Sequence, residues 1–155
     1  MDELSKYKNS YALAGNMNAR YIYHYTNYDS LQNIIKDNVM YTSESGISYS
    51  SNPNLYKRGF IFWHSSKYSE GKNHLNTGIK MKFDFNLMKS DNLRFRAGNE
   101  NMGTHAGEEE IGLMSDELNN VKKYLVEVII FKQKEKNYKL AEELLKKEGI
   151  KYRVV

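Results

Sequence analysis

Apolar and charged residues alternate without interruption in the segment IKMKFDF at residues 79–85. Successive side chains of a β-strand point to opposite faces, so the alternation predicts a strand with one buried face and one face in water. A second segment, YLVEVIIF at residues 124–131, is almost continuously apolar and predicts a central strand. Together the two segments indicate a fold organised around a β-sheet.

Two other segments have the spacing of amphipathic helices. The first is capped by Asn27 or Asp29, and its apolar residues fall on one face: Tyr28, Leu31, Ile34 and Ile35. The second begins after the cap residue Asn137 and stops at Gly149, with three leucines on its inner face: Leu140, Leu144 and Leu145.

Shorter segments complete the pattern. Strands are predicted at 20–25, 39–42, 46–50, 59–64, 111–113 and 150–154, an extended piece at 93–96 and one helical turn at 86–91. Helices do not regularly separate the strands, and the chain contains neither GxGxxG nor GxxxxGK[ST], which argues against a Rossmann or P-loop layout. The sequence predicts an α+β fold with a mainly antiparallel or split sheet.

Composition limits the other possibilities. The 155 residues fit one domain, 1–155, with residues 1–18 forming a loose N-terminal arm or a short helix. The chain has no cysteine, and its four histidines lack close metal-ligand spacing, so no metal site is predicted. No apolar run approaches the roughly 20 residues that cross a bilayer, and no signal peptide is evident, so we expect a cytoplasmic protein with no membrane partner.

The net charge of +4 has two interpretations. The positive charge keeps the protein in solution, or it attracts an anionic partner such as a nucleic acid or a dinucleotide. The densest basic stretch, residues 132–147, is interleaved with glutamates, which is more typical of a solvated helix face.

Three separated features carry candidate chemistry. His24-Tyr25-Thr26 ends a predicted strand, Ser48 and Ser50 share one face of another, and Glu108-Glu109-Glu110 follows a glycine-containing loop at 99–107. Each has an ordinary structural interpretation: a histidine at a strand end, an exposed strand edge and a solvated charge run. Tyr21, Tyr23 and Tyr25 lie on one strand face and either pack or line a cleft.

In this order the features resemble the ADP-ribosyltransferase-like superfamily. Its members have an Arg or His and a Thr on the first core strand, a hydroxyl-bearing second strand, and a late Glu, often within ExE. The opening YHYTNYDSLQNIIKDNVMYTSESGISYSSNPN resembles that of a bacterial and phage group, and DNA-modifying toxins of the DarT type share the H-x-T and helix opening. The resemblance covers residues 20–131 and implies a split antiparallel sheet with flanking helices.

The resemblance also implies roles for residues and a substrate, NAD. His24 would bind the nicotinamide ribose, with Tyr25 and Thr26 at the same turn, and the second strand would shape the floor of the site through Ser48, Ser50 and Asn52. A late glutamate would bind the ribose 2′-hydroxyl and stabilise the oxocarbenium-like state formed as nicotinamide leaves.

Strand alternation separates the three glutamates. Glu109 shares a side with Ile111 and Leu113, so an apolar inward face there turns Glu108 and Glu110 toward the opposite surface, solvent or cleft. We therefore favour Glu110 as the catalytic carboxylate, with Glu108 as its partner.

Two functions follow from the resemblance. The first is a glycosyltransferase that moves ADP-ribose from NAD to a protein or nucleic acid, as a toxin or effector of a phage or mobile element acting in the host cytoplasm would. The second is a catalytically inactive shell that binds a nucleotide or partner, as an accessory or virion component of a phage. The first is the leading hypothesis. Many relatives carry an arginine where this chain has Ser51, before Asn52, and this departure bears on catalytic competence more than on the fold.

Overall fold

The computed structural model describes residues 19–41, 60–64, 77–97, 110–115 and 117–155. Its elements in chain order are β1 (Tyr21–Thr26), α2 (Tyr28–Asp37), β2 (Val39–Tyr41), β3 (Phe60–His64), β4 (Ile79–Asp84), α3 (Phe85–Ser90), β5 (Phe95–Ala97), β6 (Glu110–Met114), β7 (Glu117–Asn119), α4 (Val121–Tyr124), β8 (Leu125–Ile130), α5 (Tyr138–Lys147) and β9 (Tyr152–Val154).

Seven of these strands form one sheet in the order β5-β6-β3-β1-β4-β8-β9, while β2 and β7 make a separate antiparallel pair. Neighbours in the large sheet are antiparallel except β8 and β9, which are parallel and connected through α5. Parallel neighbours need such a crossover. The predicted α+β architecture, an antiparallel-rich sheet with flanking helices, is confirmed.

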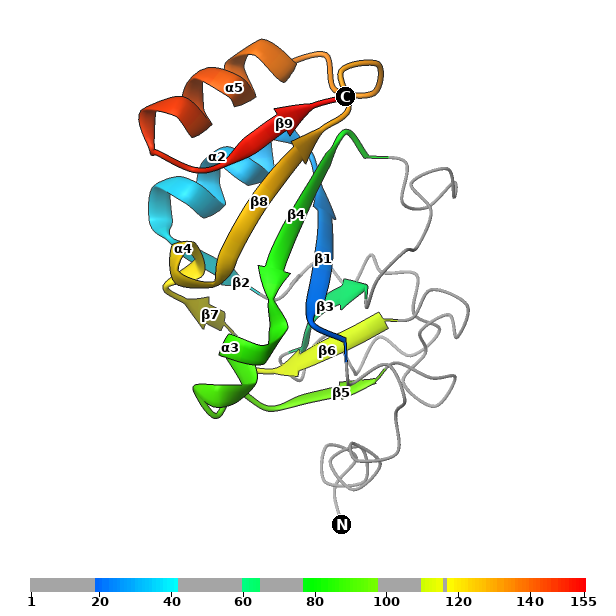
Figure 1. Ribbon diagram of the computed structural model, residues 1–155, viewed down its shortest axis with the longest axis vertical. Coiled ribbons are helices and arrows are strands. Elements are labelled where there is room, and N and C mark those ends of the chain that lie inside the picture. Colours follow the sequence, from blue (N-terminus) through cyan, green and yellow to red (C-terminus); the bar gives the residue numbers. More distant parts are fainter. Residues whose placement is uncertain (1–18, 42–59, 65–76, 98–109, 116) are drawn as a thin grey trace.

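The sheet has two chemically distinct faces. Helices α2 and α5 cover one face of β1, β4 and β8 (Figure 1), and the core lies between these helices and the sheet. Ile79, Met81 and Phe83 of β4 are fully buried there, as the alternation predicts. Burying a large apolar side chain stabilises a fold by about 1.5–3 kcal/mol, so this periodic strand contributes strongly to the core.

The ends of the two main helices agree in part with the sequence. Asn27 is the N-cap of α2, its side chain accepting a hydrogen bond from the Ser30 amide at 2.9 Å. Gly149 ends the α5 region with φ +67°, as predicted. Asn137 is the N-cap of α5, as predicted, and its carbonyl accepts a hydrogen bond from the Ala141 amide at 3.0 Å, but its side chain makes no capping hydrogen bond.

Two predictions are corrected. Leu140 is 47% exposed, because the buried stripe of α5 is set by Ala141 and Leu145, and one residue of helix turns a side chain through about 100°. Tyr124 ends the short helix α4 rather than beginning the central strand, and β7 and α4 were not predicted. The N-terminal arm at 1–18 and the strand predicted at 46–50 lie outside the described residues.

Candidate active site

His24 and Thr26 lie on the helix-covered face of β1. They alternate with Tyr23 and Tyr25, and the same face of the strand carries the fully buried Ile22. His24 pairs in register with Met81 and is partly buried, while Thr26 is only 7% exposed. Both side chains are therefore held by a central strand with hydrogen-bonded neighbours on each side, β3 and β4.

Helix α2 has two distinct stripes. Leu31 and Ile35 face the core and are fully buried. A second stripe lies at the spacing i, i+3, i+4, i+7, which places its residues on one side of the helix: Ser30, Asn33, Ile34 and Asp37. The helix ends at Asn38, whose left-handed backbone (φ 56°, ψ 34°) turns the chain directly into β2.

A groove lies between β1, this second stripe and β2. It encloses about 340 Å³ and is lined by His24, Thr26, Ser30, Asn33, Ile34, Asp37, Val39, Met40 and Tyr41. This volume is at the lower end of the range for small-molecule sites, about 300–1,000 Å³. Apolar side chains, hydroxyls, an amide, an imidazole and a carboxylate line it, the combination of an apolar lining with a few polar groups that is typical of small-molecule sites.

Several of these lining residues were not predicted from the sequence. Ser30, Asn33 and Asp37 come from the helix after His24-Tyr25-Thr26, and Tyr41 is 64% exposed at the end of β2. For the three helix residues the sequence did contain a signal, because polar residues recur at helical spacing beside the apolar stripe of this segment.

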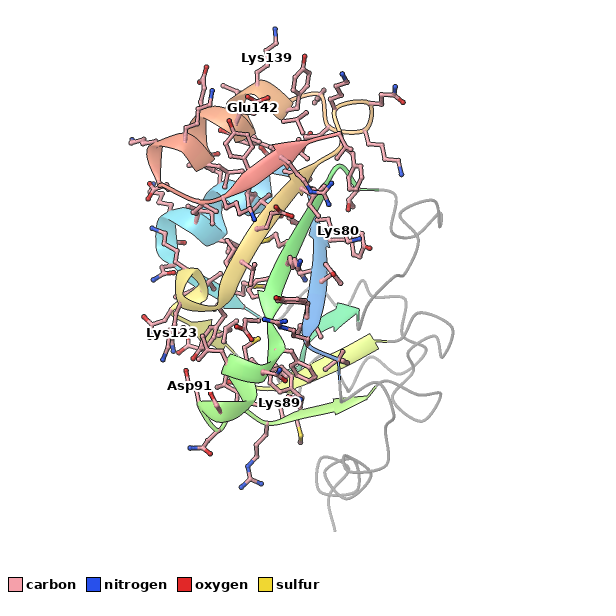
Figure 2. All side chains as sticks on the ribbon, viewed as in Figure 1. Lys80, Lys89, Asp91, Lys123, Lys139 and Glu142 are labelled. Carbon is pink, nitrogen blue, oxygen red and sulfur yellow. The ribbon has the colours of Figure 1, made fainter. Side chains whose placement is uncertain are left out.

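Tyr25 lies on the other face of the sheet. Lys80 of β4 (Figure 2) places its Nζ 4.5 Å from the centre of the Tyr23 ring and 5.7 Å from that of Tyr25, distances typical of cation–π contacts. Lys82 is similarly placed over Tyr21, at 4.2 Å. Burial, reinforced by Tyr21 and Glu127, raises the pKa of Tyr23. The three tyrosines thus pack under lysines and not into the groove.

Glu110 begins β6, two strands away from β1. Its register partner is His64 of β3, and His64 pairs with Tyr23. The backbone register therefore places position 110 in the row of Tyr23. Positions in that row share one face of the sheet, and His24, the next residue on β1, belongs to the opposite face, which carries the groove. Ile111 and Leu113 are buried, at 0% and 1% exposed, which agrees with the inward apolar face assumed in choosing among the glutamates.

The other predicted site residues, Ser48, Ser50, Asn52 and Glu108, lie outside the described residues. Within the part of the chain that the structure describes, no three His, Asp or Glu side chains are grouped to hold a metal ion, and no helix is long and apolar enough to cross a membrane.

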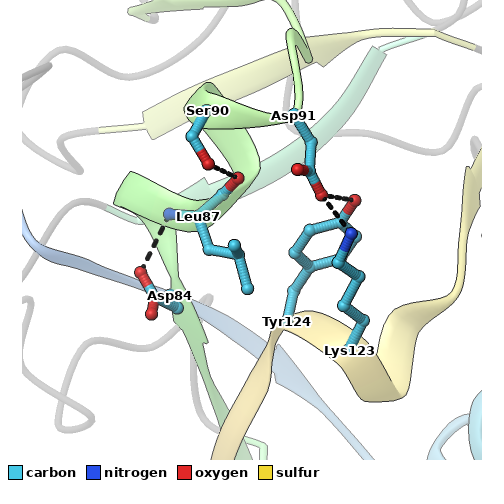
Figure 3. Close-up of polar contacts among 6 residues, drawn as sticks. All are labelled: Asp84, Leu87, Ser90, Asp91, Lys123 and Tyr124. Carbon is cyan, nitrogen blue, oxygen red and sulfur yellow. Dashed lines mark hydrogen bonds and ion pairs between the residues drawn. The ribbon is translucent and has the colours of Figure 1, made fainter.

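A separate polar cluster joins α3 to α4 (Figure 3). The Asp91 carboxylate accepts a hydrogen bond from the Tyr124 hydroxyl at 2.7 Å and pairs with Lys123 Nζ at 2.7 Å. Hydrogen bonds from Lys123 and Tyr124 lower the pKa of Asp91, while burial and Asp91 raise the pKa of Tyr124 to about 12. The three residues of this cluster lie at the ends of α3 and α4, and none of them lines the groove.

We predict that Tyr124 ionises only near pH 12. A raised folded-state pKa stabilises the fold at pH values below the unfolded tyrosine pKa, about 10, and this contribution is lost as pH rises through about 12. The difference in tyrosinate absorbance between the wild type and Tyr124→Phe, followed as a function of pH, measures the pKa of Tyr124. Asp91→Asn should lower the Tyr124 pKa only in part, because burial persists. A Tyr124 transition near pH 10 in the wild type would contradict the prediction.

Comparison with known proteins gives a result at the level of fold. No protein-family model and no curated protein matches the chain. Among solved structures it is similar to DarT from Thermus sp. 2.9 in complex with carba-NAD+, at 10% identity and a TM-score of 0.55, with 89% of this chain and 96% of DarT covered. The likeness shows that the chain shares the fold of DarT. That agrees with the fold that the H-x-T, S-x-S and E-x-E features imply.

Proposed function

We propose that this chain is an NAD-dependent ADP-ribosyltransferase. The observation that carries the proposal is the groove between β1 and α2, lined by His24 and Thr26, in a fold shared with a protein that binds an NAD analogue. The coincidence of the groove and the fold at the His24-Tyr25-Thr26 strand favours NAD as the substrate.

The proposed binding mode follows from the chemistry of the two walls. On the β1 wall, His24 binds the nicotinamide ribose and Thr26 supports the nicotinamide end. On the α2 wall, the Asn33 amide and the Asp37 carboxylate are suited to ribose hydroxyls, because hydroxyls both donate and accept hydrogen bonds. Ser48, Ser50 and Asn52 complete the floor of the site in this proposal.

The proposed reaction replaces one bond at the ribose C1′ carbon. The bond to the nicotinamide nitrogen breaks, and nicotinamide leaves with the electron pair. The developing positive charge is stabilised by a carboxylate from Glu110, assisted by Glu108. A nucleophile of the acceptor then bonds to C1′, and a carboxylate takes its proton. We propose a protein or nucleic acid as the acceptor, and a phage or mobile-element effector as the biological setting.

NAD binding tests the proposal directly. We expect titration calorimetry to show saturable binding to the wild type, and His24→Ala to weaken it by about ten-fold or more, the cost of one hydrogen bond to a partly buried group. Lys139→Ala, on the exposed side of α5 (Figure 2), is the control and should bind as the wild type does.

Transfer of labelled ADP-ribose to host lysate distinguishes the two functional alternatives. Binding with transfer supports the enzyme. Binding without transfer supports the inactive shell. A wild-type chain that does not bind NAD would overturn the enzyme and the nucleotide-binding form of the inactive shell.

A further inference from the structure

Glu135 is the one charged side chain that is buried among the residues described, at 6% exposed. It lies in the turn between β8 and α5, far in sequence from the candidate active site. A buried carboxylate is costly unless hydrogen bonds compensate for lost water. Its surroundings therefore indicate what holds it in place.

The carboxylate accepts hydrogen bonds at the start of both long helices. Oε1 accepts from the backbone amide of Tyr28, the first residue of α2. Oε2 accepts from the amide of Asn137, the residue before α5, at 3.4 Å. The amides at a helix start lack partners within the helix and carry partial positive charge, so one carboxylate here stabilises two helix ends.

The loop that carries Glu135 is also hydrogen-bonded to the residue before β4, the strand that pairs with β1. The Phe131 amide donates to the Gly78 carbonyl at 2.8 Å, and the Glu135 amide donates to the Phe131 carbonyl at 3.0 Å. Gly78 directly precedes Ile79, which pairs in register with Thr26. Glu135 therefore connects the end of β1, through β4, to the start of α2.

We propose that Glu135 is a positioning residue that sets the width of the groove. One wall of the groove belongs to β1 and the other to α2, and Asn27 alone joins these two elements along the chain. The local cap from Asn27 orders the first turn of α2 but does not fix the helix relative to the sheet. The contact between Glu135 and Tyr28, across 107 residues, fixes the first residue of the helix and adds to the core packing of Leu31 and Ile35.

Ligand binding tests the positioning role, and this arm rests on the proposed NAD function. Glu135→Ala should weaken NAD binding by about ten-fold, since small misplacement of binding groups is costly. Glu135→Gln keeps an acceptor for the Tyr28 amide and should restore affinity to within about three-fold of the wild type. Asn27→Ala is the matched control: it removes a cap from the same turn and should change affinity less than about two-fold.

The groove itself can be observed without a ligand. In amide resonance spectra, Glu135→Ala should shift the signals of Asn33, Asp37 and His24, on both walls, whereas Asn27→Ala should shift only signals near the first turn of α2. This arm is independent of whether the wild type binds NAD, so failure of the proposed function and failure of the positioning role are distinguishable.

Three outcomes would overturn the positioning role. One is equal loss of NAD affinity in Glu135→Ala and Asn27→Ala, the pattern of general destabilisation. Another is unchanged signals on both walls in Glu135→Ala. If that variant does not fold, Glu135→Gln decides: wild-type groove signals support the role, and shifted signals on both walls despite the retained acceptor overturn it.

Discussion

Replacing Glu110 with glutamine is expected to lower ADP-ribose transfer by about 10²–10³-fold, the usual cost of removing one group that stabilises transition-state charge. The change keeps the size of the side chain but removes its negative charge. Because that charge acts mainly as nicotinamide leaves, NAD affinity should change by less than about three-fold. Transfer of labelled ADP-ribose and calorimetric NAD binding measure the two effects separately.

Glu109→Gln is the matched control for this prediction, and Glu108→Gln tests the assisting carboxylate. The backbone rows align Glu110 with Tyr23 and not with His24, so each glutamate must be tested by itself. Loss of transfer in Glu109→Gln, with Glu110→Gln unaffected, would move the catalytic assignment to Glu109. Full activity in all three variants would refute a catalytic role for this segment.

Gly78→Ala is expected to lower the free energy of unfolding by about 3 kcal/mol, the upper end of the usual cost of overpacking. A Cβ at Gly78 would lie 2.3 Å from Glu135 Cβ and 2.8 Å from its Cα and backbone nitrogen. Most of these atoms are backbone, so they cannot move away as a flexible side chain can. Chemical denaturation measures the loss, and the melting temperature should fall by about 6–12 °C.

Gly149→Ala separates this clash from ordinary glycine effects. Gly149 has φ +67°, and no atom lies within 4 Å of the position that a Cβ would take, so alanine there meets backbone strain of about 1–2 kcal/mol but no collision. We expect the Gly78 variant to be the less stable of the two. Equal stability, or a Gly78 variant like the wild type, would mean that the turn at Glu135 is looser than the contact distances imply.

Much of the fold could be predicted from local pattern. The alternation at 79–85 locates β4, the spacing of Leu31 and Ile35 locates α2, and Gly149 marks the end of the α5 region. The strand order could not be predicted, because which strands become neighbours depends on long-range packing. The error at Leu140 has the same origin, since only the partner surface decides which stripe of α5 is buried.

The sequence predicts the site residues that belong to a local motif, but not the contacts between residues far apart in the chain. His24 and Thr26 were identified from their motif, and the groove contains both. Tyr25 was grouped with them, yet alternation on β1 turns it toward Lys80. Glu135 carries no motif at all: its contact with Tyr28 spans 107 residues, and no local signal announces a contact at that separation.

The position of β1 at the centre of the sheet has a consequence for biosynthesis. β1 is the first described strand to leave the ribosome, but its neighbours β3 and β4 are made later. Until then the nascent chain exposes an aromatic strand with both edges unpaired, a state prone to aggregation. Arg20 and Asn27 flank that strand with polar groups, the usual position of residues that discourage wrong pairing before the correct partners emerge.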